Sequence, residues 1–351
     1  MAEIEKLMNV DIGDIEKIMN IATDDIEKVM GVEVPASAVW TGTRGVLGGG
    51  YDSSIGVYGD QTNVIDYKSI ASTGAMSDFG DLSTDNSYLT ASSNGTRGLF
   101  MGGYTSGPNA VYNRIEYITV GSTGDVTDAG DLTQAKADTV GASNGTNAFV
   151  FGGFILSGWA ELDEIDYVAI VSTSNASDFG DISTGVIELQ GGSMNDATRA
   201  LRYQGAGSSF SYTNKYIDYI TMASTGNTSD FGDMTVAGIQ GMGGASSSTR
   251  GVAFGGRTGG SASSNVIAYV TVASTGDATD FGDLTLALDH QSSGNSSVSN
   301  LTKAETYGGY TQGTGYRNNI DYITIASTGD ATSAGSDLTS TRVQHSALSG
   351  T

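Results

Sequence analysis

The chain has 351 residues, of which 51 are glycine and 2 are proline. It contains 16 Lys and Arg against 39 Asp and Glu, a formal net charge of −23, and no cysteine. This charge disfavours binding to nucleic-acid phosphates or to anionic membrane surfaces, and the lack of cysteine excludes disulfides and thiolate metal sites. Long apolar runs are absent, so no transmembrane helix is expected. The start, MAEIEKLMNV, lacks a basic stretch followed by an apolar core, so no secretory signal is expected.

Residues 1–33 contain an 11-residue repeat. The copies IEKLMNV, IEKIMNI and IEKVMGV begin at residues 4, 15 and 26, and their apolar residues recur at helical offsets. Eleven residues make three helical turns, which favours one straight helix. Gly13 and the capping candidates Asp11, Asp14 and Thr23 favour three short helices instead, and these are what we expect, ending before Pro35. This segment either lies on the rest of the chain or docks to a partner. The docking candidates are Ile4, Met8, Ile15, Met19, Ile26 and Met30.

A second, longer repeat covers the chain from about residue 40 onward. The stretch STGDATDFGDL begins at residue 274, and its counterparts begin at residues 72, 122, 172, 224 and 327. Successive copies are therefore 50, 50, 52, 50 and 53 residues apart. Periods of this size are typical of propellers and solenoids. A stretch that occurs six times is more readily explained as scaffold than as an active site.

One copy of the repeat predicts four short strands. In the second copy these are GLFMGGY (98–104), RIEYITV (114–120), VTDAGDL (126–132) and DTVGASNG (138–145). The STGD turn between the second and third of these segments has a glycine suited to a positive φ. Short strands joined by hairpins form a meander of about 50 residues per copy.

The third strand of the last copy, IDYITIA (320–326), is largely apolar on both faces. A sheet that packs between two neighbouring sheets needs two apolar faces, so we expect six four-stranded blades arranged radially as a β-propeller. The segment TRVQHSALSGT (341–351) resembles a first strand, and GVLGGGY (45–51) resembles a second strand. The last strand would thus complete the first blade and close the ring. An open solenoid of six units is the alternative.

These residues resemble the kelch repeat. Kelch units have a glycine pair after the second strand, a tyrosine in the third and an aromatic residue in the fourth. The glycine pairs are Gly49–Gly50, Gly102–Gly103, Gly152–Gly153, Gly255–Gly256 and Gly308–Gly309. The tyrosines are Tyr67, Tyr117, Tyr167, Tyr219, Tyr269 and Tyr322, and the aromatics are Phe79, Phe179, Phe231 and Phe281. The fourth copy departs with Tyr203, Gln204 and Gly205. The tyrosine-to-aromatic spacing exceeds that of ordinary kelch repeats, so the chain looks like a divergent branch.

The segments TRG, GG, IDYITIASTGD (320–330) and STGDATDFGDL (274–284) are similar to those of kelch-like propellers in structural proteins of tailed phages, especially marine ones. The resemblance covers about residues 40–351 and implies a virion component made in the host cytoplasm. It also implies that residues 1–33 attach to other virion proteins, with the protein oligomeric in the particle. The expected domains are a docking segment, 1–33, and a propeller, 36–351.

The repeated stretch also offers candidate chemistry. Its aspartates are Asp277, Asp280 and Asp283. Carboxylates are ligands for calcium, but the EF-hand pattern is missing, and Ala75 and Asn175 replace the first aspartate in other copies. We therefore expect the aspartates to hold the turn backbone while Phe281 and Leu284 fill the space between blades. No cofactor is expected, and calcium is the alternative.

Arginine and histidine are two further candidates for functional side chains. Arginine recurs after threonine at one repeat position, as Arg44, Arg97, Arg199 and Arg250. These side chains either bind an anionic ligand or, as we expect, pair with repeat carboxylates such as Asp81 or Asp131. His290 and His345 are expected to be structural, because no nucleophile and orienting group accompany them.

Sequence diversity is concentrated in the loops between second and third strands. These are residues 51–63, 104–113, 154–163, 205–215, 257–265 and 310–319. Antiparallel geometry puts them on one face, together with the fourth-to-first loops. The aromatic candidates for recognition are Tyr58, Tyr112, Trp159, Phe210, Tyr212 and Tyr316. Exposed aromatics beside small polar residues suit glycan or protein recognition, and the alternative is that they only cover the propeller.

Three functions are compatible with these features. The expected one is a non-enzymatic virion component, in a tail fibre, tail tip or head appendage, that binds a host surface glycan or protein. The alternatives are a glycan-processing enzyme and an intracellular kelch-type adaptor. The enzyme requires converging acids that the repeat does not predict, and the adaptor usually carries a further partner domain.

Overall fold

The computed structural model describes residues 28–29, 32–33, 42–52, 60–70, 72–158, 160–182, 191–203, 215–236, 241–258, 262–289 and 296–350. Within these ranges every regular element is a β-strand, and the named strands pair antiparallel. The expected all-β class is therefore confirmed. None of the described residues belongs to a helix that is long and apolar enough to cross a membrane.

Six four-stranded sheets contain most of the described strand residues, and we number them in chain order. Sheet 1 contains β33 (Ser346–Gly350), β3 (Arg44–Gly48), β6 (Val64–Ser69) and β7 (Ser77–Asp81). Sheet 2 contains β8 (Thr90–Ser93), β9 (Arg97–Met101), β12 (Arg114–Thr119) and β13 (Thr127–Asp131). Sheet 3 contains β14 (Val140–Ser143), β15 (Asn147–Phe151), β18 (Glu164–Ala169) and β19 (Ser177–Asp181).

The remaining three sheets repeat this order of strands. Sheet 4 contains β20 (Gly192–Asn195), β21 (Arg199–Tyr203), β22 (Tyr216–Thr221) and β23 (Ser229–Asp233). Sheet 5 contains β24 (Gly243–Ser246), β25 (Arg250–Phe254), β26 (Ser264–Thr271) and β27 (Thr279–Leu288). Sheet 6 contains β28 (Ser297–Ser299), β29 (Lys303–Thr311), β30 (Gly315–Thr324) and β31 (Thr332–Asp337).

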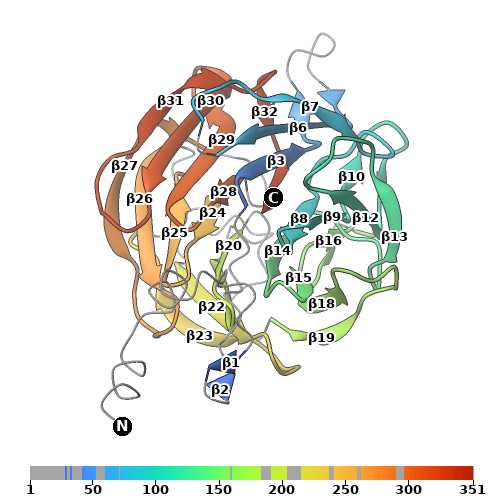
Figure 1. Cartoon of the computed structure of the whole chain (residues 1–351). Helices are drawn as coiled ribbons and strands as arrows, with labels where there is room; N and C mark the ends of the chain where they lie inside the picture. Colours follow the sequence, from blue (N-terminus) through green and yellow to red (C-terminus); the bar gives the residue numbers. More distant parts are fainter. Residues whose placement is uncertain are drawn as a thin grey trace.

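Sheet 1 joins the two ends of the repeat region. As expected, the last strand pairs with the first sheet: β33 lies beside β3, with Arg44 opposite Gly350. The first strand of each sheet contacts the first strand of the next, and β28 and β8 both contact β33. Figure 1 shows these first strands nearest a common centre and the fourth strands at the outside.

In addition to the six four-stranded sheets, the structure contains several sheets of two or three strands. One joins β32 (Arg342–Val343), β4 (Tyr51–Asp52) and β5 (Asp60–Gln61). Two hairpins join β10 (Tyr104–Thr105) to β11 (Ala110–Val111) and β16 (Phe154–Ile155) to β17 (Ala160–Glu161). A third hairpin joins β1 (Lys28–Val29) to β2 (Val32–Glu33), where the sequence predicted the third short helix. That helix prediction is wrong at these four residues, which pair as strands, Lys28 with Glu33 and Val29 with Val32. The first two predicted helices lie outside the described residues.

The apolar residues on both faces of each third strand explain why the sheets pack together. Six buried hydrophobic clusters each combine residues from two neighbouring sheets. In β30, Ile320 belongs to the cluster between sheets 6 and 1, whereas Ile323 belongs to the cluster between sheets 5 and 6. The two faces of one strand thus serve two separate cores, as the sequence pattern predicted.

The glycine pairs are required by the backbone at the end of each second strand. Gly102 and Gly103 have φ of 65° and 105°, in the region that favours glycine. A Cβ on Gly102 would lie 2.5 Å from the carbonyl oxygen of Lys136, which belongs to the segment that leads into the next sheet. The pair therefore allows close approach of a neighbouring chain segment. The corresponding residues of the fourth copy, 204 and 205, lie outside the described part of the chain.

Candidate functional site

Of the predicted recognition residues, the structure describes two. Tyr112 is half-buried, and the guanidinium of Arg114 lies 3.7 Å from its ring centroid. Tyr316 is also half-buried and lines a pocket between sheets 6, 1 and 2. The other four candidates, Tyr58, Trp159, Phe210 and Tyr212, lie outside the described residues, as do Ile4, Met8, Ile15, Met19, Ile26 and Met30.

The pocket that contains Tyr316 is the candidate site, and we call it the tyrosine pocket. It is an open hollow of about 220 Å³. Its lining residues are Tyr51, Gln61, Tyr88, Tyr104, Ser106, Tyr316 and Gln344. They come from β4, β5, β10 and β30 and from the segments that lead into β8 and β33. The variable loops and the fourth-to-first connections therefore meet here.

Two tyrosine pairs form the walls of the pocket. The ring centroids of Tyr51 and Tyr316 are 5.8 Å apart, and Tyr310 supports Tyr316 from 5.5 Å. The rings of Tyr88 and Tyr104 are 6.5 Å apart, in an edge-on arrangement. Tilted and edge-on pairs at these separations are favourable contacts between aromatic rings. Each ring is thus held by another ring rather than by a flexible loop side chain.

An unusual backbone conformation places Tyr88 beside Gln344. Both residues have positive φ, 55° and 59°, although neither is glycine. The amide of Tyr88 donates to the carbonyl oxygen of Gln344 at 3.0 Å, and the side-chain Nε2 of Gln344 donates to the Tyr88 hydroxyl at 2.6 Å. Asp138, with φ of 61°, donates its amide to the carbonyl oxygen of Tyr88 at 2.8 Å. Left-handed residues other than glycine occur disproportionately at functional sites.

Gln61 fixes the floor of the pocket. Its Nε2 donates to Ser87 Oγ at 2.6 Å and to the carbonyl oxygen of Tyr104 at 3.1 Å. Its Oε1 accepts a hydrogen bond from the amide of Ser106 at 2.6 Å. Gln61 is buried, so these bonds connect β5 of the three-stranded sheet to the β10 hairpin and to the segment that precedes β8.

The tyrosine pocket is lined by neutral groups. Burial, followed by the nearby Asp138 carboxylate, raises the pKa of Tyr88 above its ordinary value. Burial, followed by Tyr51 and Tyr310, likewise raises the pKa of Tyr316. Both phenols therefore keep their protons at neutral pH and remain able to donate hydrogen bonds. No Asp, Glu, His, Lys or Arg is among the residues that line the described hollow.

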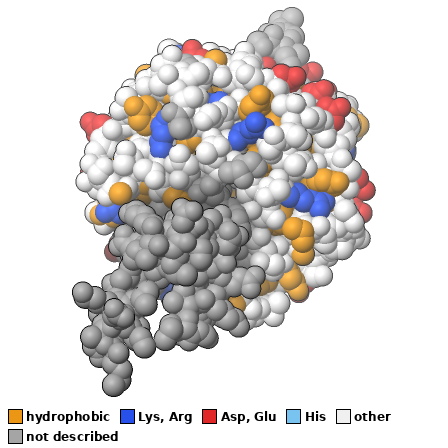
Figure 2. Space-filling view, viewed as in Figure 1, with side chains coloured by type: hydrophobic (Ala, Val, Ile, Leu, Met, Phe, Trp, Pro, Cys, Tyr) orange, Lys and Arg blue, Asp and Glu red, His pale blue; other side chains and the backbone are white. Residues whose placement is uncertain are grey.

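Among the described residues, the recurring arginines contact tyrosine rings and backbone carbonyls instead of the carboxylates that the sequence predicted. Arg97 lies 3.6 Å from the ring centroid of Tyr117 in its own sheet, and its Nη1 donates to the carbonyl oxygen of Val171 in the next sheet at 2.8 Å. Arg44, Arg199 and Arg250 repeat both contacts with their own tyrosine and next sheet. Stacking on the ring leaves the guanidinium aimed at a backbone carbonyl rather than at an acid. On the face in Figure 2, Lys and Arg side chains lie apart, next to hydrophobic ones.

The aspartates of the repeated turn have an architectural contact. Asp277 Oδ1 accepts a hydrogen bond from the backbone amide of Asp233, in the sheet before it, at 3.0 Å. Asn175 and Asn227 accept the corresponding bond at 3.1 and 3.0 Å. The first side chain of the turn therefore holds the neighbouring sheet, and an amide serves as well as a carboxylate. At the repeat position of Asp280, Asp178 Oδ1 accepts from the amide of Gly180 at 3.1 Å, so this aspartate does hold its local backbone as predicted. Phe281 and Leu284 are buried between sheets 5 and 6, as predicted. Across the described residues, no group of three or more His, Cys, Asp or Glu could hold a metal ion.

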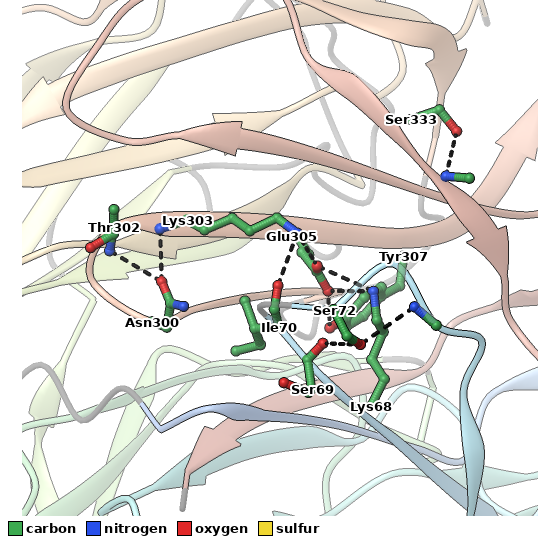
Figure 3. Close-up of polar contacts among 12 residues, drawn as sticks. Lys68, Ser69, Ile70, Ser72, Asn300, Thr302, Lys303, Glu305, Tyr307 and Ser333 are labelled. Atoms are coloured by element: carbon green, nitrogen blue, oxygen red, sulfur yellow. Dashed lines mark hydrogen bonds and ion pairs between the residues drawn. The ribbon is translucent and has the colours of Figure 1, made fainter.

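A buried charged cluster joins sheets 6 and 1, and Figure 3 shows it in close-up. Lys68 Nζ in β6 lies 3.2 Å from a carboxylate oxygen of Glu305 in β29. Lys303 Nζ donates to Glu305 at 2.8 Å and to the carbonyl oxygen of Ile70 at 2.9 Å, and the Tyr307 hydroxyl donates to Glu305 at 3.0 Å. Burial lowers the pKa of Lys68, while Glu305 opposes that shift. The side chains of Lys68 and Glu305 are 1% and 0% exposed, so we assign the cluster to packing rather than chemistry.

The centre of the molecule offers only a small cavity. It measures about 90 Å³ and is lined by glycine, alanine, serine and a few other side chains from the first strands of the sheets. Its serines form hydrogen bonds between neighbouring sheets. Ser143 Oγ donates to the carbonyl oxygen of Ser93 at 2.8 Å, and Ser299 Oγ donates to the carbonyl oxygen of Ser246 at 2.6 Å. His345, just before β33, is fully buried, and His290 lies outside the described residues. The tyrosine pocket is therefore the better candidate site.

Comparison with known proteins adds no family to this description. No protein-family model matches the chain, and no curated protein matches it. Sequence reasoning anticipated Tyr316, and its variable loops include Tyr51, Gln61 and Tyr104. It missed Tyr88 and Gln344, which precede first strands. The signal that could have found them is that both occupy the same repeat position, two residues before a first strand.

Proposed function

We propose that the six sheets are the blades of a closed, six-bladed, kelch-like β-propeller formed by residues 36–351. Support comes from the four antiparallel strands of each sheet and from the six cores between neighbouring sheets. The core between sheets 6 and 1 contains Leu47 from one end of the repeat region and Tyr307 from the other. The left-handed glycine pairs fit the kelch pattern.

We further propose that the protein is a non-enzymatic virion component that binds a host surface glycan or protein through the face carrying the tyrosine pocket. The pocket is the observation that carries this proposal: rigid aromatic walls with a few polar groups are typical of binding sites. The virion context depends on the sequence resemblance to phage kelch-like propellers. Residues 1–33 are proposed to dock the propeller to other virion proteins and to support oligomerisation in the particle.

A glycan-processing enzyme is less well supported by the pocket. Glycoside hydrolysis usually requires a pair of carboxyl groups on either side of the scissile bond, and the residues lining the tyrosine pocket include none. An intracellular adaptor would use a comparable face, so cellular context distinguishes it from a virion protein.

The proposal is tested with purified particles and purified protein. Mass spectrometry and immunogold labelling of phage particles should detect the protein on the virion surface, and the full-length protein should bind host cells. A chain that lacks residues 1–33 should still bind cells but should not enter particles. Absence from particles, together with no cell binding, would contradict the proposed function, and normal incorporation of the shortened chain would contradict the docking role.

A further inference from the structure

We infer that the tyrosine pocket binds a single neutral sugar ring through Tyr51, Tyr88, Tyr316 and Gln344. This inference rests on the proposed binding function and names the ligand class for its site. The first step concerns shape. The hollow of about 220 Å³ lies below the roughly 300–1,000 Å³ of pockets for drug-sized ligands, so it suits one ring rather than a folded peptide segment.

The second step concerns the walls of the pocket. A pyranose has an apolar face of C–H groups that pack on aromatic rings, and an equator of hydroxyls that needs hydrogen-bond partners. The partly exposed rings of Tyr51 and Tyr316, 5.8 Å apart, supply the aromatic surface. The Tyr88 hydroxyl accepts from Gln344 Nε2 at 2.6 Å, which leaves its own proton available to a ligand hydroxyl.

The third step concerns charge. The lining contains no cation to hold a sugar carboxylate or sulfate. The negative charge of Asp138 lies close enough to raise the pKa of Tyr88. The whole chain also carries a net charge of −23. An acidic sugar would therefore be disfavoured by both the site and the long-range field. A quaternary ammonium group suits aromatic walls, but it has no acceptor for the proton of the Tyr88 hydroxyl, which already accepts from Gln344 Nε2. A neutral sugar satisfies both the rings and the polar groups.

The fourth step concerns preorganisation. Tyr88 and Gln344 occupy left-handed backbone positions that are tied together by an amide-to-carbonyl bond of 3.0 Å, and Tyr310 supports Tyr316 from behind. A site that is rigid before binding loses less conformational entropy when the ligand enters. The pocket should therefore select among neutral sugars by the stereochemistry of their hydroxyls.

The test uses saturation-transfer NMR on the full-length protein with methyl glucoside, methyl galactoside, methyl mannoside and N-acetylglucosamine. Glucuronic acid, N-acetylneuraminic acid and choline are the comparison ligands. At least one neutral sugar should bind, and Tyr316→Ala and Gln344→Ala should each weaken it by about tenfold or more. Tyr216→Ala is the matched control, because Tyr216 is 44% exposed in β22 and does not line the pocket. Thermal melting should confirm that all three variants fold.

The outcomes separate this inference from the proposed function. Binding of choline or of acidic sugars alone, binding of no probe, or neutral-sugar binding that survives in folded Tyr316→Ala and Gln344→Ala protein would each overturn the inference. If the protein still binds host cells in those cases, the proposed function stands with another ligand. If a neutral sugar binds at the pocket but host cells are not bound, the inference stands and the proposed function fails.

Discussion

At the scale of single residues, one recurring position explains how neighbouring sheets are joined. The first residue of the second strand is arginine in four sheets, and its guanidinium stacks on the tyrosine of its own third strand while it donates to a carbonyl of the next sheet. In sheet 6 the position holds Lys303, whose ammonium lies 4.0 Å from the ring of Tyr322 and donates to Ile70 of sheet 1. One cation thus makes both an intra-sheet and an inter-sheet contact.

We predict that Arg97→Ala lowers the free energy of unfolding by about 1–2 kcal/mol, because it removes a cation–π contact and a hydrogen bond to Val171. Urea unfolding measures this change. Arg97→Lys is the control, and it should retain most of the stability because lysine makes both contacts in sheet 6. An equally large loss in the lysine variant would show that the planar guanidinium is required.

The sequence could supply only part of this residue-scale picture. It identified Tyr117 and its counterparts as third-strand tyrosines and Arg97 as a repeat residue. The carbonyl that Arg97 contacts lies 74 residues away in the sequence, and a backbone acceptor has no side-chain signature. Carboxylates were the visible partners, so the predicted pairing was wrong. Tyr88 was missed for a similar reason, since its left-handed backbone at φ 55° is not encoded by glycine.

At the scale of elements, the turn and the fourth strand form one joint between two sheets. The glycine of DFGDL allows the turn of the next sheet to approach: a Cβ on Gly282 would lie 2.5 Å from the backbone of Gly329. The amide of Gly329 donates to the carbonyl oxygen of Phe281 at 2.8 Å, and Asp330 accepts from the amide of Asp283 at 3.0 Å. The motif that repeats most clearly in the sequence is therefore the part where each sheet contacts the next.

This joint gives a prediction that separates architecture from calcium binding. Asp277→Asn should leave stability nearly unchanged, because Asn175 and Asn227 accept the same hydrogen bond. Asp277→Ala should lower the free energy of unfolding by about 1 kcal/mol or less, through loss of the bond from Asp233. Adding EDTA or millimolar calcium should not move the melting temperature. A calcium-dependent rise in melting temperature that Asp277→Asn abolishes would restore the calcium alternative.

At the scale of the whole molecule, sequence patterns predicted the strands better than they predicted the side-chain contacts between sheets. The 50-residue period and the doubly apolar third strands were enough to predict four-stranded sheets with two cores each. The N-terminal pattern was misleading at Lys28–Val29 and Val32–Glu33, where spacing typical of helices accompanies two paired strands. Polar contacts between sheets 6 and 1, such as that of Lys68 with Glu305, join residues 237 apart in the sequence. No repeat pattern in the sequence predicted these contacts.

The final prediction concerns closure of the proposed ring. Deleting residues 341–351 removes β32 and β33, exposes the edge of β3, and takes Leu348 from the core between sheets 1 and 2 and Ala347 from the core between sheets 6 and 1. It also removes Arg342, whose Nη2 lies 2.8 Å from a carboxylate oxygen of Asp66. Both side chains are almost fully buried. An unpaired edge and a buried charge without its partner are both strongly destabilising. We expect aggregation or loss of the single cooperative transition in calorimetry, whereas deletion of Thr351 alone should leave melting unchanged. Unaltered melting of the longer deletion would mean that the sheets do not depend on closure through β33.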